Sequence, residues 1–268
     1  MIYVFLSHDV DWRKAGAPLS HILARRERFD EGILKNCESR NPYYNFPEYM
    51  EIEEKFCVRS TFFFRTYLKD AIYPPPPYHV EEYKDEIRSL LGGGWEIGLH
   101  LDPASYRSIK MIQKEKKALE DVARVPIYAN RVHYTMNNDM LHKNLQKLSF
   151  KYDSSAKFSR EKIVDEDFGY FKNGKLVIFP ITIMDALAFT YLAKSENEVI
   201  SLVKYTVNKC RKLPLEKRII TIIWHDCVLK MKKGRCYQQI LEYLTSLKDI
   251  TVKRGIDLFE MIEKGTIQ

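Results

Sequence analysis

Short apolar runs alternate with longer segments of helical periodicity along the whole chain. The first run, Ile2–Leu6, is mainly β-branched and aromatic and is too short for a typical helix. An unbroken run of this kind predicts a strand buried on both faces, as in a parallel sheet. Similar runs predict strands over Ile2–Leu6, Ser60–Phe64, Trp95–Leu99, Ile127–Asn130, Phe150–Asp153, Leu176–Pro180, Ile181–Asp185 and Arg218–Trp224.

The segments between these runs carry apolar residues at helical spacing. Helices are predicted over Phe46–Phe56, Glu81–Leu91, Pro103–Val122, Asn137–Leu148, Asn197–Arg211, Cys236–Leu247 and Leu258–Ile262. Alternation of strands and helices implies an α/β fold with parallel strands, which either an open doubly wound sheet or a barrel satisfies. No internal repeat or linker interrupts this order, so residues 1–268 are expected to form a single domain.

Polar residues that can carry chemistry follow directly after several of the predicted strands. They are Asp9, Asp11, His100, Asp102, Arg131, His133, Asp153 and His225. In a (β/α) barrel the carboxyl ends of the strands converge on one rim, where barrel enzymes keep their active sites. So many such residues at strand ends favour a barrel with a functional site over a purely structural explanation.

Two carboxylates stand close together at the end of the first strand. Side chains alternate along a strand, so Asp9 and Asp11 share one face and His8 lies on the other. Like charges this close need a cation or a shared proton. An aspartate that caps a helix is the alternative, but a cap needs one carboxylate and not two. A metal or acid–base site is therefore the better interpretation.

A long polar segment, residues 13–47, is inserted directly after this strand. Its middle part, Leu19–Leu34, has some helical periodicity, and Asn41–Pro47 is an aromatic loop. Loops inserted at strand ends often contact substrate, although a flap that packs over the barrel explains the segment equally well.

Composition limits the partners and the compartment. The net charge of +7 is modest, and the basic clusters Arg25–Arg28 and Lys230–Arg235 are short and lack interleaved aromatic residues. This pattern favours solvated surface or attraction to an anionic ligand, and it argues against nucleic-acid binding. The five cysteines form no Cys-x-x-Cys pair, no run is long enough to span a membrane, and the chain starts on its first strand. A cytoplasmic protein without a signal peptide is therefore expected.

The strand-end residues, taken in order, resemble the motifs of the polysaccharide deacetylase family, which is carbohydrate esterase family four with its NodB-homology domain. The similar segments are Ser7–Asp11, Glu96–His100, Arg131–Tyr134, Tyr152–Ser155 and Ile223–His225. The resemblance implies a distorted (β/α) barrel that uses one divalent metal ion, with zinc as the first choice. It also implies the following roles: Asp9 as the catalytic base, Asp11 and His100 as metal ligands, Arg131 as the brace of the base, His225 as the general acid, and Asp153 as the brace of the acid.

This chain departs from the family pattern at one metal ligand. The family usually has a second histidine four residues after the first, and Ala104 stands there instead. The residues leave the third ligand open. Asp102 is the first choice because an extended backbone points it to the same side as His100, and its replacement is then expected to weaken metal binding. His133 is the second choice and otherwise, with Tyr134, a candidate substrate contact.

Two further alternatives for this ligand are Ser105, which would be a weak ligand, and an open position filled by water. Asp185 belongs to a segment, Pro180–Asp185, that is similar to a divergent branch of the family, and it is a candidate supporting residue of the site.

The expected activity is metal-dependent hydrolysis of an amide C–N bond that removes an acetyl group from an N-acetylated sugar or glycan. Two alternatives remain open at the level of the sequence. One is hydrolysis of a different C–N bond in a small cytosolic metabolite, and the other is a non-catalytic glycan-binding relative that has lost the metal.

Overall fold

Among the described strands, the first strand of the chain has the most partners in the sheet. In the computed structural model, which describes residues 1–69 and 71–267, β1 (Ile2–Val10) is nine residues long and has three parallel neighbours. Its first half pairs with β10, the second half of the same edge pairs with β2, and the other edge pairs with β9. A strand of this length can pair with two strands along one edge, so β1 connects β10, β2 and β9.

The sheet has ten strands in the order β6-β7-β5-β4-β3-β2-β1-β9-β8, with β10 added beside β1. All pairs are parallel except the hairpin of β6 and β7. The remaining strands are β2 (Thr61–Phe64), β3 (Glu96–Leu101), β4 (Ala129–Val132), β5 (Tyr152–Asp153), β6 (Phe171–Asn173), β7 (Leu176–Ile178), β8 (Ile183–Met184), β9 (Ile219–Ile223) and β10 (Ile250–Lys253). The helices are α1 (Leu19–Leu23), α2 (Glu31–Lys35), α3 (Phe46–Lys55), α4 (Lys84–Gly92), α5 (Ile109–Ala123), α6 (Asp139–Lys147), α7 (Glu196–Cys210), α8 (Cys236–Ser246) and α9 (Gly255–Glu263).

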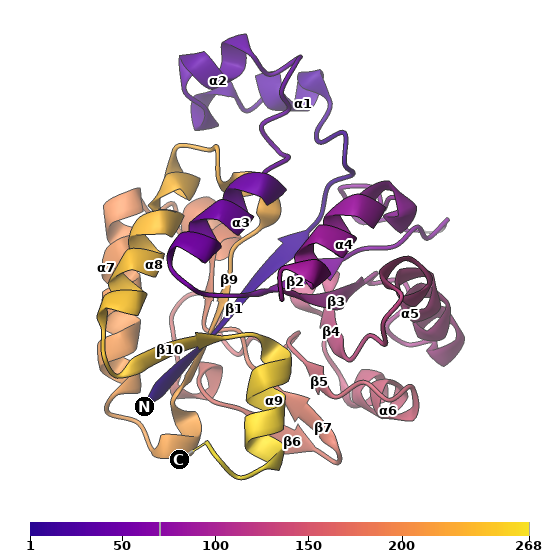
Figure 1. The fold of residues 1–268 in the computed structure, drawn as a ribbon, viewed down its shortest axis with the longest axis vertical. Coiled ribbons are helices and arrows are strands. Elements are labelled where there is room, and N and C mark those ends of the chain that lie inside the picture. Colours follow the sequence, from indigo (N-terminus) through magenta and orange to yellow (C-terminus); the bar gives the residue numbers. More distant parts are fainter. Residues whose placement is uncertain (70, 268) are drawn as a thin grey trace.

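The sheet curls into a half-barrel with helices around it (Figure 1), so the predicted distorted (β/α) barrel is confirmed. Among the described residues no strand pairing joins β6 to β8, so the barrel is not closed by hydrogen-bonded strands. A segment without strand structure crosses this gap. Residues 179–182 run from β7 at one end of the sheet to β8 at the other, and their backbone amides bond to Asp153, Ala156 and Thr221 on the way. This crossing leaves both strands short.

Two apolar layers follow from the alternation along the strands. Phe5 lies on the concave face of the sheet, in a cluster with Phe63, Tyr152 and Phe179 that Leu258 and Ile262 of α9 cover. Val4 and Leu6 lie on the convex face, in the larger core beneath the other helices. Since Asp9 follows Phe5 by four residues, it belongs to the concave side.

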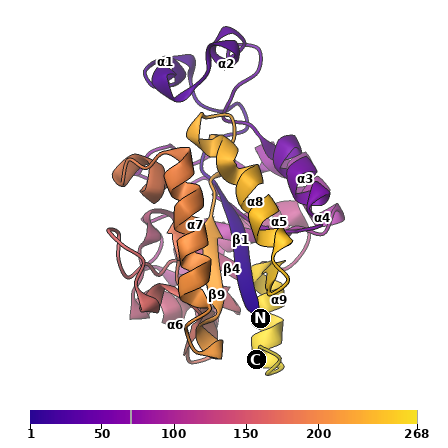
Figure 2. The same cartoon turned by 90° about the vertical axis from the view of Figure 1, so that its left-hand side faces the viewer.

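The inserted segment forms a small unit of its own at the carboxyl end of β1. Its helical pattern is broken into α1, the single turn Arg26–Arg28 and α2, and Figures 1 and 2 show α1 and α2 standing beyond the end of the barrel. A separate apolar cluster, which includes Phe29 and Tyr43, attaches this unit to Cys227 and Met231 of the barrel.

None of the described helices has the length and apolar character needed to cross a membrane.

Candidate active site

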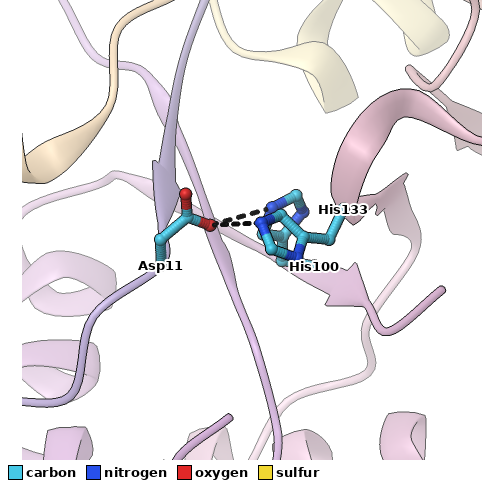
Figure 3. Close-up of side chains that lie close together, drawn as sticks. All are labelled: Asp11, His100 and His133. Carbon is cyan, nitrogen blue, oxygen red and sulfur yellow. Dashed lines mark ion pairs between the residues drawn. The ribbon is translucent and has the colours of Figure 1, made fainter. Parts of the chain in front are cut away.

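Three potential metal ligands meet at the rim of the barrel. Asp11 comes from the end of β1, His100 from β3, and His133 from the turn that follows β4. One ligand atom from each lies within 4.8 Å of the others, and all three side chains are buried. Figure 3 shows both imidazole rings turned toward the Asp11 carboxylate: Asp11 Oδ1 is 3.2 Å from His100 Nε2 and 3.6 Å from His133 Nε2.

The chemistry of this group fits a divalent cation. His100 Nδ1 lies 3.0 Å from the carbonyl oxygen of Arg131, which can only accept, so Nδ1 carries a proton and donates there, and Nε2 is the ring atom that faces Asp11. Asp11 Oδ1 and His100 Nε2 are buried and lack a hydrogen-bond partner among the described residues. Burial lowers the pKa of His133 to about 3, which keeps that ring neutral and able to ligate. One carboxylate and two imidazoles form a donor set that zinc prefers.

Asp9 is held beside this group by a buried arginine. Arg131 Nη1 donates to Asp9 Oδ1 at 2.6 Å, and the guanidinium also donates to the carbonyl and hydroxyl oxygens of Ser154 at 3.0 Å each. Burial by itself would raise the pKa of Asp9, but the charge of Arg131, followed by His100 and His225, outweighs burial and lowers that pKa. Asp9 is therefore an oriented, ionised carboxylate on the concave face, as the alternation along β1 predicts.

His225 approaches the group from the opposite side. Its Nδ1 lies 2.6 Å from Asp185 Oδ1, its backbone amide donates to Asp185 Oδ2 at 2.9 Å, and its Nε2 lies 3.6 Å from Asp11 Oδ2. Burial alone would lower the pKa of His225, but Asp185 above all, then Asp11 and Asp9, raise it to about 10. The ring is a cationic proton donor fixed by one carboxylate, which suits the protonation of a leaving group.

Asp153 does not hold His225, which corrects the pairing that the resemblance implies. Its carboxylate accepts from Asn130 Nδ2 at 2.6 Å, and from the Ser155 hydroxyl and amide at 2.7 and 3.0 Å. The reason lies in the strand order: β5 is separated from β9 by four strands, whereas β8 lies beside β9. The crossing from β7 to β8 brings Asp185 to His225, and the local sequence does not reveal that crossing.

Asp102 also lies outside the metal-ligating group, where its place is taken by His133. Arg65, fully buried at the end of β2, donates to Asp102 Oδ2 at 3.0 Å and also to the carbonyl of Pro75. The other carboxylate oxygen accepts from the Ala104 amide at 2.9 Å and closes a tight turn. Arg65 directly follows the apolar run Phe62–Phe64 in the sequence. A buried cation at the end of a strand needs an acidic partner nearby, and this position was the signal that Asp102 could form an ion pair there.

The remaining candidates lie around this centre. Tyr134, with a left-handed φ of +62°, is 41% exposed, packs its ring at 4.5 Å from that of His133, and donates to the carbonyl of Pro74 at 3.1 Å. It stands at the outer edge of the site, where it can meet a ligand. Ser105 is buried but does not belong to the ligating group.

A cavity of about 500 Å³ opens beside the group. Asp11, Asp185 and His225 line it from the barrel, and residues of the inserted segment line it from the opposite side. The inserted segment therefore supplies one wall of this cavity, in keeping with a role in ligand contact. The sequence leaves ligand contact and a packing flap equally open; the apolar cluster shows the packing, and ligand contact stays a prediction.

No protein-family model matches the sequence, and no curated protein sequence is similar to it. Solved structures do resemble the fold. A polysaccharide deacetylase from Mycobacterium smegmatis, described as putative, superposes with a TM-score of 0.67 at 20% identity over 99% of this chain and 91% of the other. A Puue allantoinase gives 0.68 at 12% identity over 100% and 92%. A CE4 family pseudoenzyme from Bacillus anthracis gives 0.56 at 12% identity over 96% and 65%. The chain thus has the NodB-like fold of carbohydrate esterase family four.

Proposed function

We propose that the protein is a metal-dependent hydrolase that removes the acetyl group from a small N-acetylated sugar. The observation that carries this proposal is that a ligating group and two charged pairs of side chains meet at one rim of the barrel. A group of three potential metal ligands lies between the Asp9–Arg131 pair on one side and the His225–Asp185 pair on the other. A carboxylate base and a cationic acid on either side of a cation site are what hydrolysis of an amide requires.

In this mechanism Asp9 accepts the proton of the attacking water. Arg131 keeps the carboxylate ionised and fixes its orientation, because the arginine itself is anchored by Ser154. His225 then donates the proton on Nε2 to the leaving amine, and Asp185 holds the ring through Nδ1 so that Nε2 faces the site. The products are acetate and the free amino sugar.

Asp11, His100 and His133 would hold the cation, which we propose to be zinc. When bound, a divalent cation supplies Lewis acidity, lowering the pKa of water and polarising a carbonyl group. The protein prepares for it by keeping His133 neutral and by engaging Nδ1 of His100 with the Arg131 carbonyl, which leaves Nε2 for the cation.

The direct test is release of acetate from N-acetylated hexosamines by the purified protein, with and without zinc and after chelation. Metal-dependent release supports the proposal. A protein that binds one equivalent of metal but releases no acetate from a broad substrate panel contradicts it, and would favour the non-catalytic alternative that a pseudoenzyme with this fold illustrates.

Removal of His133 is expected to weaken metal binding far more than removal of Asp102. His133→Ala deletes one of three ligands, and we expect zinc affinity to fall by at least ~10–100-fold, the range found even for residues that only support a ligand. Asp102→Asn keeps the tight turn and should leave affinity unchanged, since its carboxylate bonds to Arg65. Zinc titration of both variants decides between them, and a loss confined to Asp102→Asn would restore Asp102 as the ligand.

Replacement of Asp185 is expected to lower kcat much more than replacement of Asp153. Asp185→Asn removes the charge that keeps His225 cationic, and general acid catalysis contributes about 10²–10⁴-fold. KM should change less than kcat, because the Asp185 carboxylate is engaged with His225. Asp153→Asn disturbs hydrogen bonds to Asn130 and Ser155 instead, so it should lower thermal stability more than kcat. Equal losses of kcat in the two variants would argue against the Asp185 assignment.

A second candidate is hydrolysis of another C–N bond in a small metabolite. The cavity favours a compact substrate, because the inserted segment walls it and its volume is about 500 Å³, and an allantoinase shares the fold. Turnover of a panel of cyclic amides and ureides, without turnover of N-acetylated sugars, would select this candidate.

The reaction is proposed to take place in the cytoplasm. All five cysteines are free, and four of them are buried. Unpaired thiols are typical of proteins from a reducing compartment.

A further inference from the structure

We infer that the substrate carries a phosphate group, bound by the basic residues that line the cavity beside His225. This inference rests on the proposed function and specifies its substrate class: a small phosphorylated N-acetylated amino sugar. The basic residues are Arg25, Arg28, Lys232 and Lys233, and they line the same cavity as Asp11 and His225.

The four cations come from two distant segments that the fold fixes side by side. Arg25 and Arg28 belong to the inserted segment, whereas Lys232 and Lys233 follow β9. The amide of Lys232 donates to the carbonyl of Arg28 at 2.8 Å, and its ammonium donates to the carbonyl of Glu27 at 3.2 Å. These bonds join the two basic segments, so all four cationic residues line one cavity, with Arg25 and Lys233 half-buried and Arg28 and Lys232 exposed at its mouth.

Most of this positive charge is not neutralised. Among the described residues, Arg25, Lys232 and Lys233 have no carboxylate within 4.0 Å, and only Arg28 has one, the Glu27 oxygen 3.7 Å from its Nε. The other acids of the cavity, Asp11 and Asp185, are engaged with histidines. Clustered cations that share a concave surface attract an anion, and arginine matches the geometry of a phosphate.

His21, which lies beside Arg25 in the cavity wall, neither adds to the positive charge nor reduces it. Arg25 Nη1 lies 3.2 Å from His21 Nδ1. Burial, and then Arg25 and Arg28, lower the pKa of His21. His21 is therefore neutral at pH 7, and its ring packs on Trp12 with centroids 4.6 Å apart.

The rest of the wall suits the ring of a sugar. Trp12 and Tyr43 pack edge to face with centroids 5.2 Å apart, and Phe189 and Met231 add apolar surface. The cavity holds about 500 Å³ between aromatic rings and cations, and His225 lines it. A small sugar with an anionic end fits this combination, with its reacting bond beside His225.

Binding is tested by calorimetry with N-acetylglucosamine, its 1-phosphate, its 6-phosphate and inorganic phosphate. At least one sugar phosphate should bind ~10-fold or more tightly than the neutral sugar, a factor that corresponds to about 1.4 kcal/mol. The 1-phosphate and 6-phosphate reveal which end of the sugar reaches the cations. Equal affinity for the neutral and both phosphorylated sugars overturns the inference.

Two variants of the cavity and one matched control locate the phosphate. Arg25→Gln and Lys233→Gln remove cations from the cavity, whereas Arg26→Gln removes the same charge from an exposed neighbour that does not line it. We expect the first two to lose most of the preference for the sugar phosphate over the neutral sugar, and Arg26→Gln to behave as the unmodified protein. Equal effects of Arg25→Gln and Arg26→Gln would show that only net charge matters and would refute the site.

The outcomes separate this inference from the proposed function. Tight binding of a sugar phosphate without acetate release supports the cation cluster and contradicts the hydrolase. Acetate release that is equally fast from neutral and phosphorylated sugars supports the hydrolase and contradicts the cation cluster.

Discussion

Asp9→Asn is expected to lower kcat for acetate release by at least ~10²-fold, the lower limit of the contribution of general acid–base catalysis. Asparagine keeps the shape of the side chain and can still accept from Arg131, but it cannot take a proton from water. Metal content should remain that of the unmodified protein, because Asp9 is not among the three residues of the ligating group. The measurement is kcat at saturating substrate together with elemental analysis.

A suitable control is Asp121→Asn, which makes the same change on the exposed face of α5. Thermal unfolding of both variants must accompany the kinetics, since Asp9→Asn leaves Arg131 buried without its counter-charge. A folded Asp9→Asn variant that retains full activity would rule out the proposed base.

The largest effect on stability is expected for Glu53, which lies on the opposite side of β1. Its side chain is fully buried and accepts four hydrogen bonds: from His8 Nε2 at 2.8 Å, the Ser60 hydroxyl at 2.9 Å, the Trp95 indole at 2.7 Å and the Tyr237 hydroxyl at 2.8 Å. One carboxylate thus joins α3 to β1, to the residues that precede β2 and β3, and to α8. The other ring nitrogen, His8 Nδ1, lies 2.6 Å from the Trp224 carbonyl, so the ring is held between α3 and the end of β9.

Glu53→Gln is therefore expected to lower the free energy of unfolding by ~3–5 kcal/mol, the cost of removing one partner of a buried ion pair. The amide group of glutamine would point donor hydrogens at neighbours that are themselves donors. Denaturant unfolding measures the loss. Its control is Glu54→Gln, an exposed neighbour on the same helix whose ion pair with Arg59 is worth at most ~1 kcal/mol. Similar stabilities of the two variants would refute the role of Glu53.

The opposed faces of β1 could be predicted from the sequence because they depend only on the period of a strand. Asp9 and Asp11 turn to the concave side, and His8 turns to the helices. The gathering of strand-end residues also followed from a general rule for parallel strands. Glu53, by contrast, stands in the run Glu51–Glu54 and resembles an exposed residue of an amphipathic helix, so its role was hidden.

The errors concern pairs of side chains that meet across the sheet. Asp153 and Asp102 both lie at predicted strand ends, yet their partners depend on which strands are neighbours. Asp185 reaches His225 only because the chain crosses from β7 to β8, and Asp102 is held by Arg65 from the adjacent β2. Strand order is a property of the whole fold. Local sequence patterns could therefore identify the candidate site residues but could not predict which side chains contact one another.

The pairing of β1 with three strands also determines when the molecule can be completed during synthesis. The strand made first has β9 and β10, which end at Lys253, as two of its three partners, and Ile2 is in register with Ile250. A growing chain therefore carries the strand that bears Asp9 with one whole edge unpaired until almost all residues have been added. Contacts of such long sequence separation slow folding. The barrel, and with it the site, is therefore expected to form only after β9 and β10 have been synthesised.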